Sequence, residues 1–209
     1  MAEAVRRGCQ VVAACPPTSM VAQHAAGRWS TVLPTTTSDQ LATAVVMLTY
    51  LHQIGLGPSA PPEEVAEALD SVATACSPHR DLAVNPAKML AIALADANPI
   101  VWGGSVLAAR AARRVAESIR RASGRTALAG DAEHLLPVIE AARPRDVFDD
   151  PFSDDGGELR PMLLVLDDGA DDVVEHLSSE AGCEVARYAS LLLSGTYAAE
   201  YLRLGLIEG

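Results

Sequence analysis

Residues 85–105, NPAKMLAIALADANPIVWGGS, contain a helix start, a strand and a glycine turn in the order typical of an α/β protein. Asn85-Pro86 combines a good N-cap with a proline at the first helical position, so a helix is expected from there to about Ala95. The short apolar stretch Ile100–Trp102 predicts a buried strand. Gly103-Gly104-Ser105 then predicts a tight turn into a further helix.

The same alternation continues towards the C-terminus. Apolar residues at helical spacing after the turn predict a helix that ends at Gly124. Strands are expected at Thr126–Ala129 and Met162–Leu166, helices from Asp131 to about Ala142, at Asp171–Ala181 and at Glu184–Leu204, and an acidic loop at Arg143–Arg160. This order indicates a parallel sheet covered by helices.

The first part of the chain reads as a helix end, a glycine and a strand, which is the second half of an αβ unit. The run Glu3–Gly8 predicts the helix end, and the β-branched run Gln10–Ala14 predicts the strand. We therefore expect an N-terminally incomplete domain. The remaining expected elements are a strand at Thr31–Leu33, a helix capped by Ser38 that runs to about Ile54, a helix from Pro61 to about Ala75, and a linker at Ser77–Val84.

Composition excludes several classes of function. The 209 residues carry a net charge of −11, which disfavours sequence-independent binding to nucleic acids because such binding depends on basic residues. Four scattered cysteines without a CxxC pair favour reduced thiols and a cytoplasmic protein. No stretch predicts a signal peptide, and the longest apolar run, Leu41–Leu51, is too short to cross a membrane.

Two short stretches are candidates for a site. Gly103, Gly104 and Ser105 lie between a predicted strand and a predicted helix, where free N–H groups bind phosphates or sugars; the alternative is a turn that needs glycine only for its geometry. Glu133 and His134 pair a carboxylate with an imidazole, as proton transfer between adjacent carbons requires. The alternative for this pair is a solvated helix start.

Metal binding is not expected. The five histidines lack the spacing of zinc ligands, and the acidic loop around Asp149–Glu158 does not match an EF-hand. Five arginines lie on one face of the helix after the glycine turn. That face is expected either to be solvated or subunit-facing, or to hold a phosphate. The five are Arg110, Arg113, Arg114, Arg120 and Arg121.

Residues 85–104 and the C-terminal run 184–206, EVARYASLLLSGTYAAEYLRLGL, resemble the bifunctional phosphoglucose/phosphomannose isomerases, which have the SIS (sugar isomerase) fold. In that family NPAK, a helix and a strand of type PVIYG open the second subdomain. Residues 5–58 resemble the later part of the first subdomain. The resemblance implies an α/β, SIS-like parallel sheet flanked by helices in three layers, with a partial first subdomain at 1–78 and a complete second one at 85–209.

The family's catalytic groups do not map onto this chain. Its phosphate loop of type SxSxxT has no counterpart here. Its catalytic base, a glutamate, corresponds to Arg121, and its ring-opening histidine corresponds to Pro137, with His134 nearby. Glu133 and His134 are therefore the catalytic candidates by residue type and not by position.

The resemblance implies the interconversion of aldose and ketose 6-phosphates through an enediol, without metal, nucleotide or other cofactor. The expected function is binding of a sugar phosphate by a glucose-6-phosphate/mannose-6-phosphate isomerase type of protein in carbohydrate metabolism. The alternative is a catalytically degenerate regulatory module or a structural dimerisation module. A homodimer is expected because relatives pair and because the helix at 184–204 is apolar nearly all round.

Overall fold

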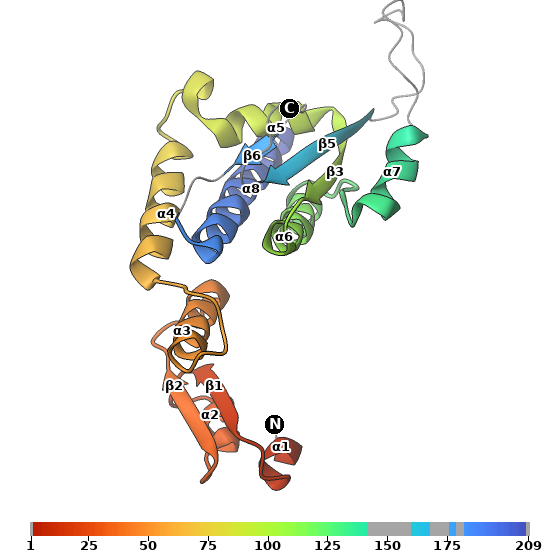
Figure 1. Ribbon diagram of the computed structural model, residues 1–209. Coiled ribbons are helices and arrows are strands. Elements are labelled where there is room, and N and C mark those ends of the chain that lie inside the picture. Colours follow the sequence, from red (N-terminus) through yellow and green to blue (C-terminus); the bar gives the residue numbers. More distant parts are fainter. Residues whose placement is uncertain (1, 142–159, 168–175, 179–181, 208–209) are drawn as a thin grey trace, which may run out of the picture. The chain divides into compact units, whose positions relative to one another are not determined.

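The computed structural model describes residues 2–141, 160–167, 176–178 and 182–207 (Figure 1). The chain divides into two compact units, Met1–Ala66 and Glu67–Gly209, and helix α4 (Pro62–Ala75) spans the division. The stretch Ser77–Val84, predicted as an interdomain linker, lies within the second unit and ends in a 3-10 turn, Leu82–Val84. Each unit is described by itself.

The first unit contains strands at both places where the sequence predicts them, β1 (Val11–Cys15) and β2 (Ser30–Pro34), and the two pair in parallel. One helix between them was missed: the six-residue α2, whose first turn is capped by the Ser19 side chain. The next helix begins one residue later than expected, because Asp39 and not Ser38 accepts the N–H of Ala42, at 2.7 Å. The elements are α1 (Ala2–Arg6), β1 (Val11–Cys15), α2 (Met20–Ala25), β2 (Ser30–Pro34) and α3 (Gln40–Gln53).

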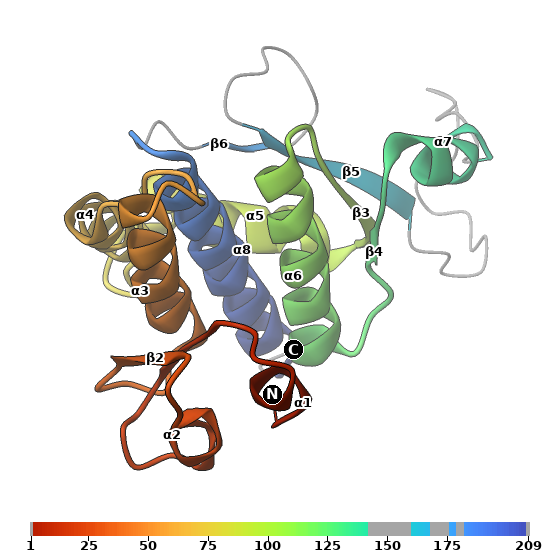
Figure 2. The same cartoon turned by 60° about the horizontal axis from the view of Figure 1, so that its bottom comes forward.

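The second unit is a four-stranded parallel sheet with helices packed on it; the strand order is β4 (Leu128–Ala129), β3 (Ala97–Gly103), β5 (Arg160–Asp167) and β6 (His176–Ser178). Figure 2 shows α6 and α8 side by side on one face of this sheet. The elements after α4 are α5 (Pro86–Ala95), β3 (Ala97–Gly103), α6 (Val106–Ser123), β4 (Leu128–Ala129), α7 (Ala132–Glu140), β5 (Arg160–Asp167), β6 (His176–Ser178) and α8 (Glu184–Ile207). The predicted α/β class, with parallel sheets flanked by helices, is confirmed.

One predicted element is wrong where the structure describes it. A helix was expected over Asp171–Ala181, but His176–Ser178 is strand β6, paired in parallel with Val165–Asp167 of β5. Pairing with a neighbouring strand overrides the local helical pattern, since helix propensity is a weak preference. The rest of that expected helix, and the acidic loop up to residue 159, lie outside the described residues.

The core of the second unit joins the sheet to α6 and α8 through small side chains. Val101 and Leu164 of the strands meet a face of α6 that consists largely of alanines. Gly195 of α8 lies against α6: a Cβ atom added there would come 2.4 Å from Cγ2 of Val115, which is fully buried. The two helices can therefore pack closely only because α8 has no side chain at this position.

Helix α8 is covered largely by its own chain. It packs against both α5 and α6, and residues on several sides of it are buried. Among its described large apolar side chains, only Leu204 is exposed. The apolar pattern of this helix therefore does not require a partner chain to cover it, contrary to what the sequence suggests.

The NPAK motif holds the segment before α5 in place. Asn85 is completely buried; its side chain accepts the N–H of Lys88 and donates to the carbonyl oxygen of Ser77, both at 3.0 Å. The Lys88 ammonium donates to the carbonyls of Pro78 and Arg80, each at 2.8 Å, and lies 5.5 Å from the centre of the Tyr201 ring. The motif's role in this chain is thus structural.

Tyr201 of α8 completes this arrangement. Its hydroxyl donates to the carbonyl oxygen of Cys76 at 2.7 Å. Desolvation by burial raises the pKa of the Tyr201 phenol and also that of the Cys76 thiol. Both groups therefore stay protonated at neutral pH, and the phenol remains a donor.

Substituting Gly195 tests the close packing of α6 and α8. We expect Gly195→Ala to destabilise the second unit by about 1–3 kcal/mol, because Val115 is buried and cannot move away freely. Gly205→Ala is the matched control in the same helix, since a Cβ there meets nothing within 4 Å. Urea unfolding should show the control unchanged or slightly stabilised; equal effects of the two substitutions would contradict the packing described here.

Removing the Asn85 side chain tests the NPAK motif. Asn85→Ala should cost roughly 2 kcal/mol in urea unfolding, because a cap is lost and buried polar groups are left without partners. Ser105→Ala removes an exposed cap of α6 and should cost about 1 kcal/mol or less. A smaller loss for Asn85→Ala than for Ser105→Ala would show that the buried amide does not hold the segment.

Candidate functional site

The glycine turn Gly103-Gly104-Ser105 connects strand β3 to helix α6. A Cβ atom on Gly103 would lie 2.2 Å from the backbone carbon of Ala108, so only glycine allows the strand end to approach the first turn of α6. The φ angle of Gly103 is not in the left-handed region. The requirement for glycine here is therefore one of space.

Ser105 is the N-cap of α6 and accepts hydrogen bonds from two backbone N–H groups near the start of the helix. Its side-chain oxygen accepts the N–H of Ala108 at 3.1 Å, and its carbonyl accepts the N–H of Ala109 at 2.8 Å. The N–H groups of Val106 and Leu107 precede these bonds, so they have no partner within the helix. They give the start of this 18-residue helix the character of an anion site.

The start of α8 is built differently. Cys183 precedes the helix, and its sulfur accepts the N–H of Ala186 at 3.3 Å. Arg187 lies one turn into the helix, where its guanidinium donates to the carbonyl of Gly182 at 3.3 Å. Glu184, at the first position of α8, is exposed.

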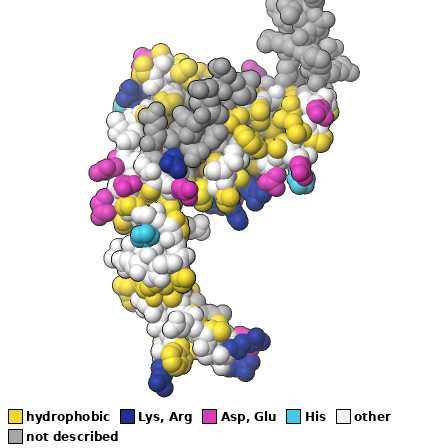
Figure 3. All heavy atoms as spheres, in the orientation of Figure 1, with side chains coloured by type: hydrophobic (Ala, Val, Ile, Leu, Met, Phe, Trp, Pro, Cys, Tyr) yellow, Lys and Arg dark blue, Asp and Glu magenta, His cyan; other side chains and the backbone are white. Residues whose placement is uncertain are grey.

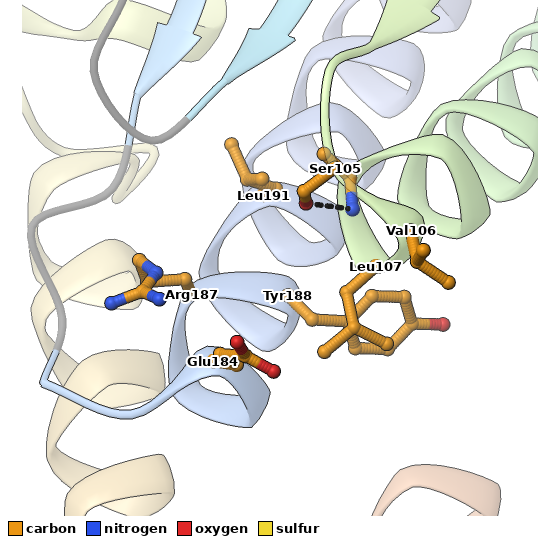
Figure 4. A pocket seen from close by; sticks show the side chains of 8 residues that line it. Ser105, Val106, Leu107, Glu184, Arg187, Tyr188 and Leu191 are labelled. Carbon is orange, nitrogen blue, oxygen red and sulfur yellow. Dashed lines mark hydrogen bonds between the residues drawn. The ribbon is translucent and has the colours of Figure 1, made fainter.

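The two helix starts enclose a pocket of about 290 Å³ (Figure 4). In Figure 4 the Tyr188 ring extends towards Leu107 at the start of α6, whereas the Arg187 side chain extends from the other side of α8. The pocket follows the carboxyl end of β3, which is where ligands bind in open α/β sheets. Its lining residues are Ser105, Val106, Leu107, Ala108, Glu184, Arg187, Tyr188 and Leu191.

The lining is mixed in chemistry. The N-termini of two helices and the Arg187 guanidinium favour a negative group. Glu184 is the acidic residue of the lining and disfavours a second negative group near its own carboxylate. Tyr188 and Leu191 provide an apolar wall. This set suits a small ligand with one anionic end and a neutral, partly apolar body.

The structure brings part of the predicted site to this pocket. Ser105 lines it, Gly103 is buried behind it and Gly104 is exposed in the same turn. Glu133 and His134 lie elsewhere: both are exposed on the first turn of α7 and neither lines the pocket. The two candidate stretches are thus not combined in one pocket.

The positions that correspond to the family's catalytic groups are also outside the pocket. Arg121 is exposed near the end of α6, with its guanidinium 3.5 Å from the carboxylate of Glu117. Pro137 lies within α7. Neither residue lines the pocket formed by the helix starts.

Sequence reasoning did not find the contribution of α8. Glu184, Arg187 and Tyr188 come from a helix that was recognised only for its apolar pattern. The sequence did contain a signal for a site here: three polar side chains lie on the first turns of an otherwise apolar helix, directly after a strand of the sheet. Their approach to α6 depends on tertiary packing that the sequence does not state.

Most of the arginine face of α6 is paired within the chain. Arg114 and Arg121 lie near Glu117, and Arg113 is 3.6 Å from Asp131 of the α7 start. Arg120 donates to the carbonyl of Ala127. These partners favour a solvated, ion-paired surface over a phosphate clamp.

The described residues also define other surface features. Acidic side chains gather over α4, where Glu63, Glu64, Glu67 and Asp70 are exposed (Figure 3). No group of three or more His, Cys, Asp or Glu side chains that could hold a metal ion occurs among the described residues. None of the helices described is long and apolar enough to cross a membrane.

No protein-family model matches the chain, and neither does any curated protein. Several solved structures are similar, among them the following two. One is a glucose-6-phosphate isomerase-like protein from Thermus thermophilus, 18% identical over 84% of this chain with a TM-score of 0.55. The other is tagatose-6-phosphate ketose/aldose isomerase from Escherichia coli, 14% identical over 94% of this chain with a TM-score of 0.62.

These likenesses concern the fold. The chain spans about three fifths of each structure's length, 59% and 60% respectively. One neighbour is named an isomerase and the other isomerase-like, and the likeness supports the α/β fold with parallel sheets flanked by helices that the sequence predicts. The likeness does not extend to a particular subfamily.

A proline at the first position of α6 tests the anion site directly. Val106→Pro deletes one free N–H while keeping the helix, because proline is favoured at this position. We expect inorganic phosphate to bind roughly tenfold more weakly, as judged by isothermal titration. Ala132→Pro makes the same change at the first position of α7 and should leave phosphate binding unchanged. Equal losses in both variants, or none in either, would argue against the pocket.

Proposed function

We propose that this chain binds a sugar phosphate in the pocket between the starts of α6 and α8. The observation that carries the proposal is the position of this pocket: it lies where β3 ends and two helices begin, with Ser105 at its edge. Such a place combines unsatisfied N–H groups with the positive ends of helix dipoles. The sugar-phosphate isomerase neighbours support the same ligand class.

Each part of the ligand has a matching part of the lining. The phosphate would accept hydrogen bonds from the N–H groups of Val106 and Leu107. Arg187, on the α8 side of the same pocket, would add positive charge to the lining. The hydroxyl groups of the sugar would donate to Glu184. The ring face of Tyr188 would cover the C–H face of the sugar.

The proposed function is binding with little or no turnover. An enediol mechanism needs a positioned base, a ring-opening acid and a phosphate anchor. The pocket supplies an anchor, but Arg121 and Pro137 stand where the family has its base and its acid, and both lie outside the lining. We accordingly assign residues 1–78 to a partial first SIS subdomain and residues 85–209 to a second SIS subdomain. We propose that the second subdomain is related to the glucose-6-phosphate/mannose-6-phosphate isomerases and has lost their catalytic groups.

Isothermal titration with four compounds tests the ligand class. Fructose 6-phosphate and glucose 6-phosphate should bind more tightly than inorganic phosphate, and unphosphorylated fructose should not bind measurably. Arg187→Met should weaken the hexose phosphates by roughly tenfold. Arg114→Met, on an ion-paired surface outside the pocket, is the control and should change nothing. If hexose phosphates bind no more tightly than inorganic phosphate, the pocket recognises an anion and not a sugar phosphate.

A coupled isomerase assay tests the absence of turnover. We expect negligible conversion of glucose 6-phosphate or mannose 6-phosphate to fructose 6-phosphate by the 209-residue chain. Loss of a single placed acid–base group typically costs about 10² to 10⁴ in rate, and here both family positions are changed. Turnover close to that of a working isomerase, abolished by Glu133→Gln or His134→Ala, would instead make α7 the catalytic element.

A further inference from the structure

The two helix starts that line the pocket differ in charge. The first turn of α6 contains no acidic residue, whereas α8 begins with Glu184. Both helices present backbone N–H groups at their first turns, and these favour an anion. At the start of α8, however, an anion would also meet the negative charge of a carboxylate. The pocket therefore has one end that favours a negative group and one end that opposes it.

Glu184 belongs to the face of α8 that lines the pocket. Arg187, Tyr188 and Leu191 follow it at helical spacing and line the same cavity. In Figure 4 the Glu184 carboxylate lies towards Tyr188, whereas the Arg187 guanidinium extends in another direction. No ion pair among the described residues includes Glu184. Within that part of the chain, no salt bridge neutralises its charge.

Two roles are open to the Glu184 carboxylate. An acidic residue in the first turn of a helix interacts favourably with the helix dipole, so Glu184 could stabilise α8 and take no part in binding. An acid on any side of the first turn would serve that purpose. Glu184 lies on the side that lines the pocket, where a bound ligand is exposed to its charge.

We propose that Glu184 selects ligands by the charge of the end that lies away from the phosphate; this inference rests on the function proposed above. With the phosphate at the start of α6, the other end of the ligand lies at Glu184. A neutral end donates hydroxyl hydrogen bonds to the carboxylate, whereas a second phosphate or a carboxylate is repelled by it. The pocket accordingly takes sugar monophosphates and excludes sugar bisphosphates and phosphorylated sugar acids.

Isothermal titration with fructose 6-phosphate and fructose 1,6-bisphosphate tests this selection. The ratio of the two dissociation constants isolates the second phosphate, because the first is common to both compounds. In dilute buffer the bisphosphate should bind the unmodified chain at least roughly tenfold more weakly than the monophosphate. Glu184→Gln keeps the shape of the side chain without its charge and should bring the two constants within roughly threefold of each other. Glu184→Lys should make the bisphosphate the tighter ligand.

Glu133→Gln is the matched control. Glu133 is also an acidic residue in the first turn of a helix, but it does not line the pocket, so this substitution should leave the ratio unchanged. A second pair of compounds, glucose 6-phosphate and 6-phosphogluconate, should give the same order of variants, because the acid carries a carboxylate where the sugar is neutral.

Salt dependence separates charge from shape. The Debye length falls from about 30 Å at 0.01 M to about 8 Å at 0.15 M ionic strength, and Glu184 is exposed. The discrimination by the unmodified chain should therefore weaken as salt is added. Discrimination that stays constant with salt would mean that the second phosphate is excluded by its size, which would overturn the role of Glu184.

The possible failures are distinguishable. If neither fructose 6-phosphate nor glucose 6-phosphate binds, the proposed function is wrong and the selection by Glu184 is wrong with it. If the monophosphates bind but the ratio is the same in the unmodified chain, Glu184→Gln and Glu184→Lys, the pocket still holds a sugar phosphate and only the role of Glu184 is overturned. Urea unfolding of the same variants then measures what Glu184 contributes to the stability of α8 alone.

Discussion

The close approach of α6 to both β3 and α8 is the contact on which the second unit depends. Gly103 admits the first turn of α6 against the strand end, and Gly195 admits the middle of α6 against α8. A side chain at either glycine would overlap atoms of α6, at 2.2 Å and 2.4 Å respectively. The two glycines thereby allow close packing against α6 both at its start and at its centre.

The pocket is a consequence of this packing. Because α6 and α8 lie side by side on one face of the sheet, their N-terminal turns open at the same place (Figures 2 and 4). The first N–H groups of α6 and Arg187 of α8 then both belong to the lining of one pocket. Binding of an anion at this point would need only backbone groups and one arginine, and no acid–base residue.

Much of the fold was accessible from the sequence because local signals agree with tertiary structure there. Asn85-Pro86 marks the start of α5, Gly124 adopts the left-handed conformation that ends α6, and the apolar run before Asp167 forms β5. The signals failed where pairing decides the outcome. Strand β6 forms because β5 is beside it, and α2 is too short to produce a clear period.

Only half of the site could be predicted from the sequence, for a similar reason. A glycine turn between a strand and a helix is a local signal, and it led to Ser105. The residues of α8 reach the same pocket from about 80 positions further along the chain, through a helix contact that no short motif encodes. Glu133 and His134 satisfied a chemical pattern, yet α7 places them on an exposed turn outside the pocket. Their catalytic role remains a prediction with no support from the position of the pocket.

We propose that the start of α6 holds the phosphate of a sugar phosphate. The most direct measurement is a titration of the isotopically labelled chain with fructose 6-phosphate, followed by the backbone amide signals of Val106 and Leu107 in two-dimensional NMR spectra. We predict large, saturable shifts of these two signals, with the amides of Ala132 and Glu133 at the start of α7 unchanged. Shifts confined to the start of α7, or no saturable shift at either helix, would show that the start of α6 does not hold the phosphate.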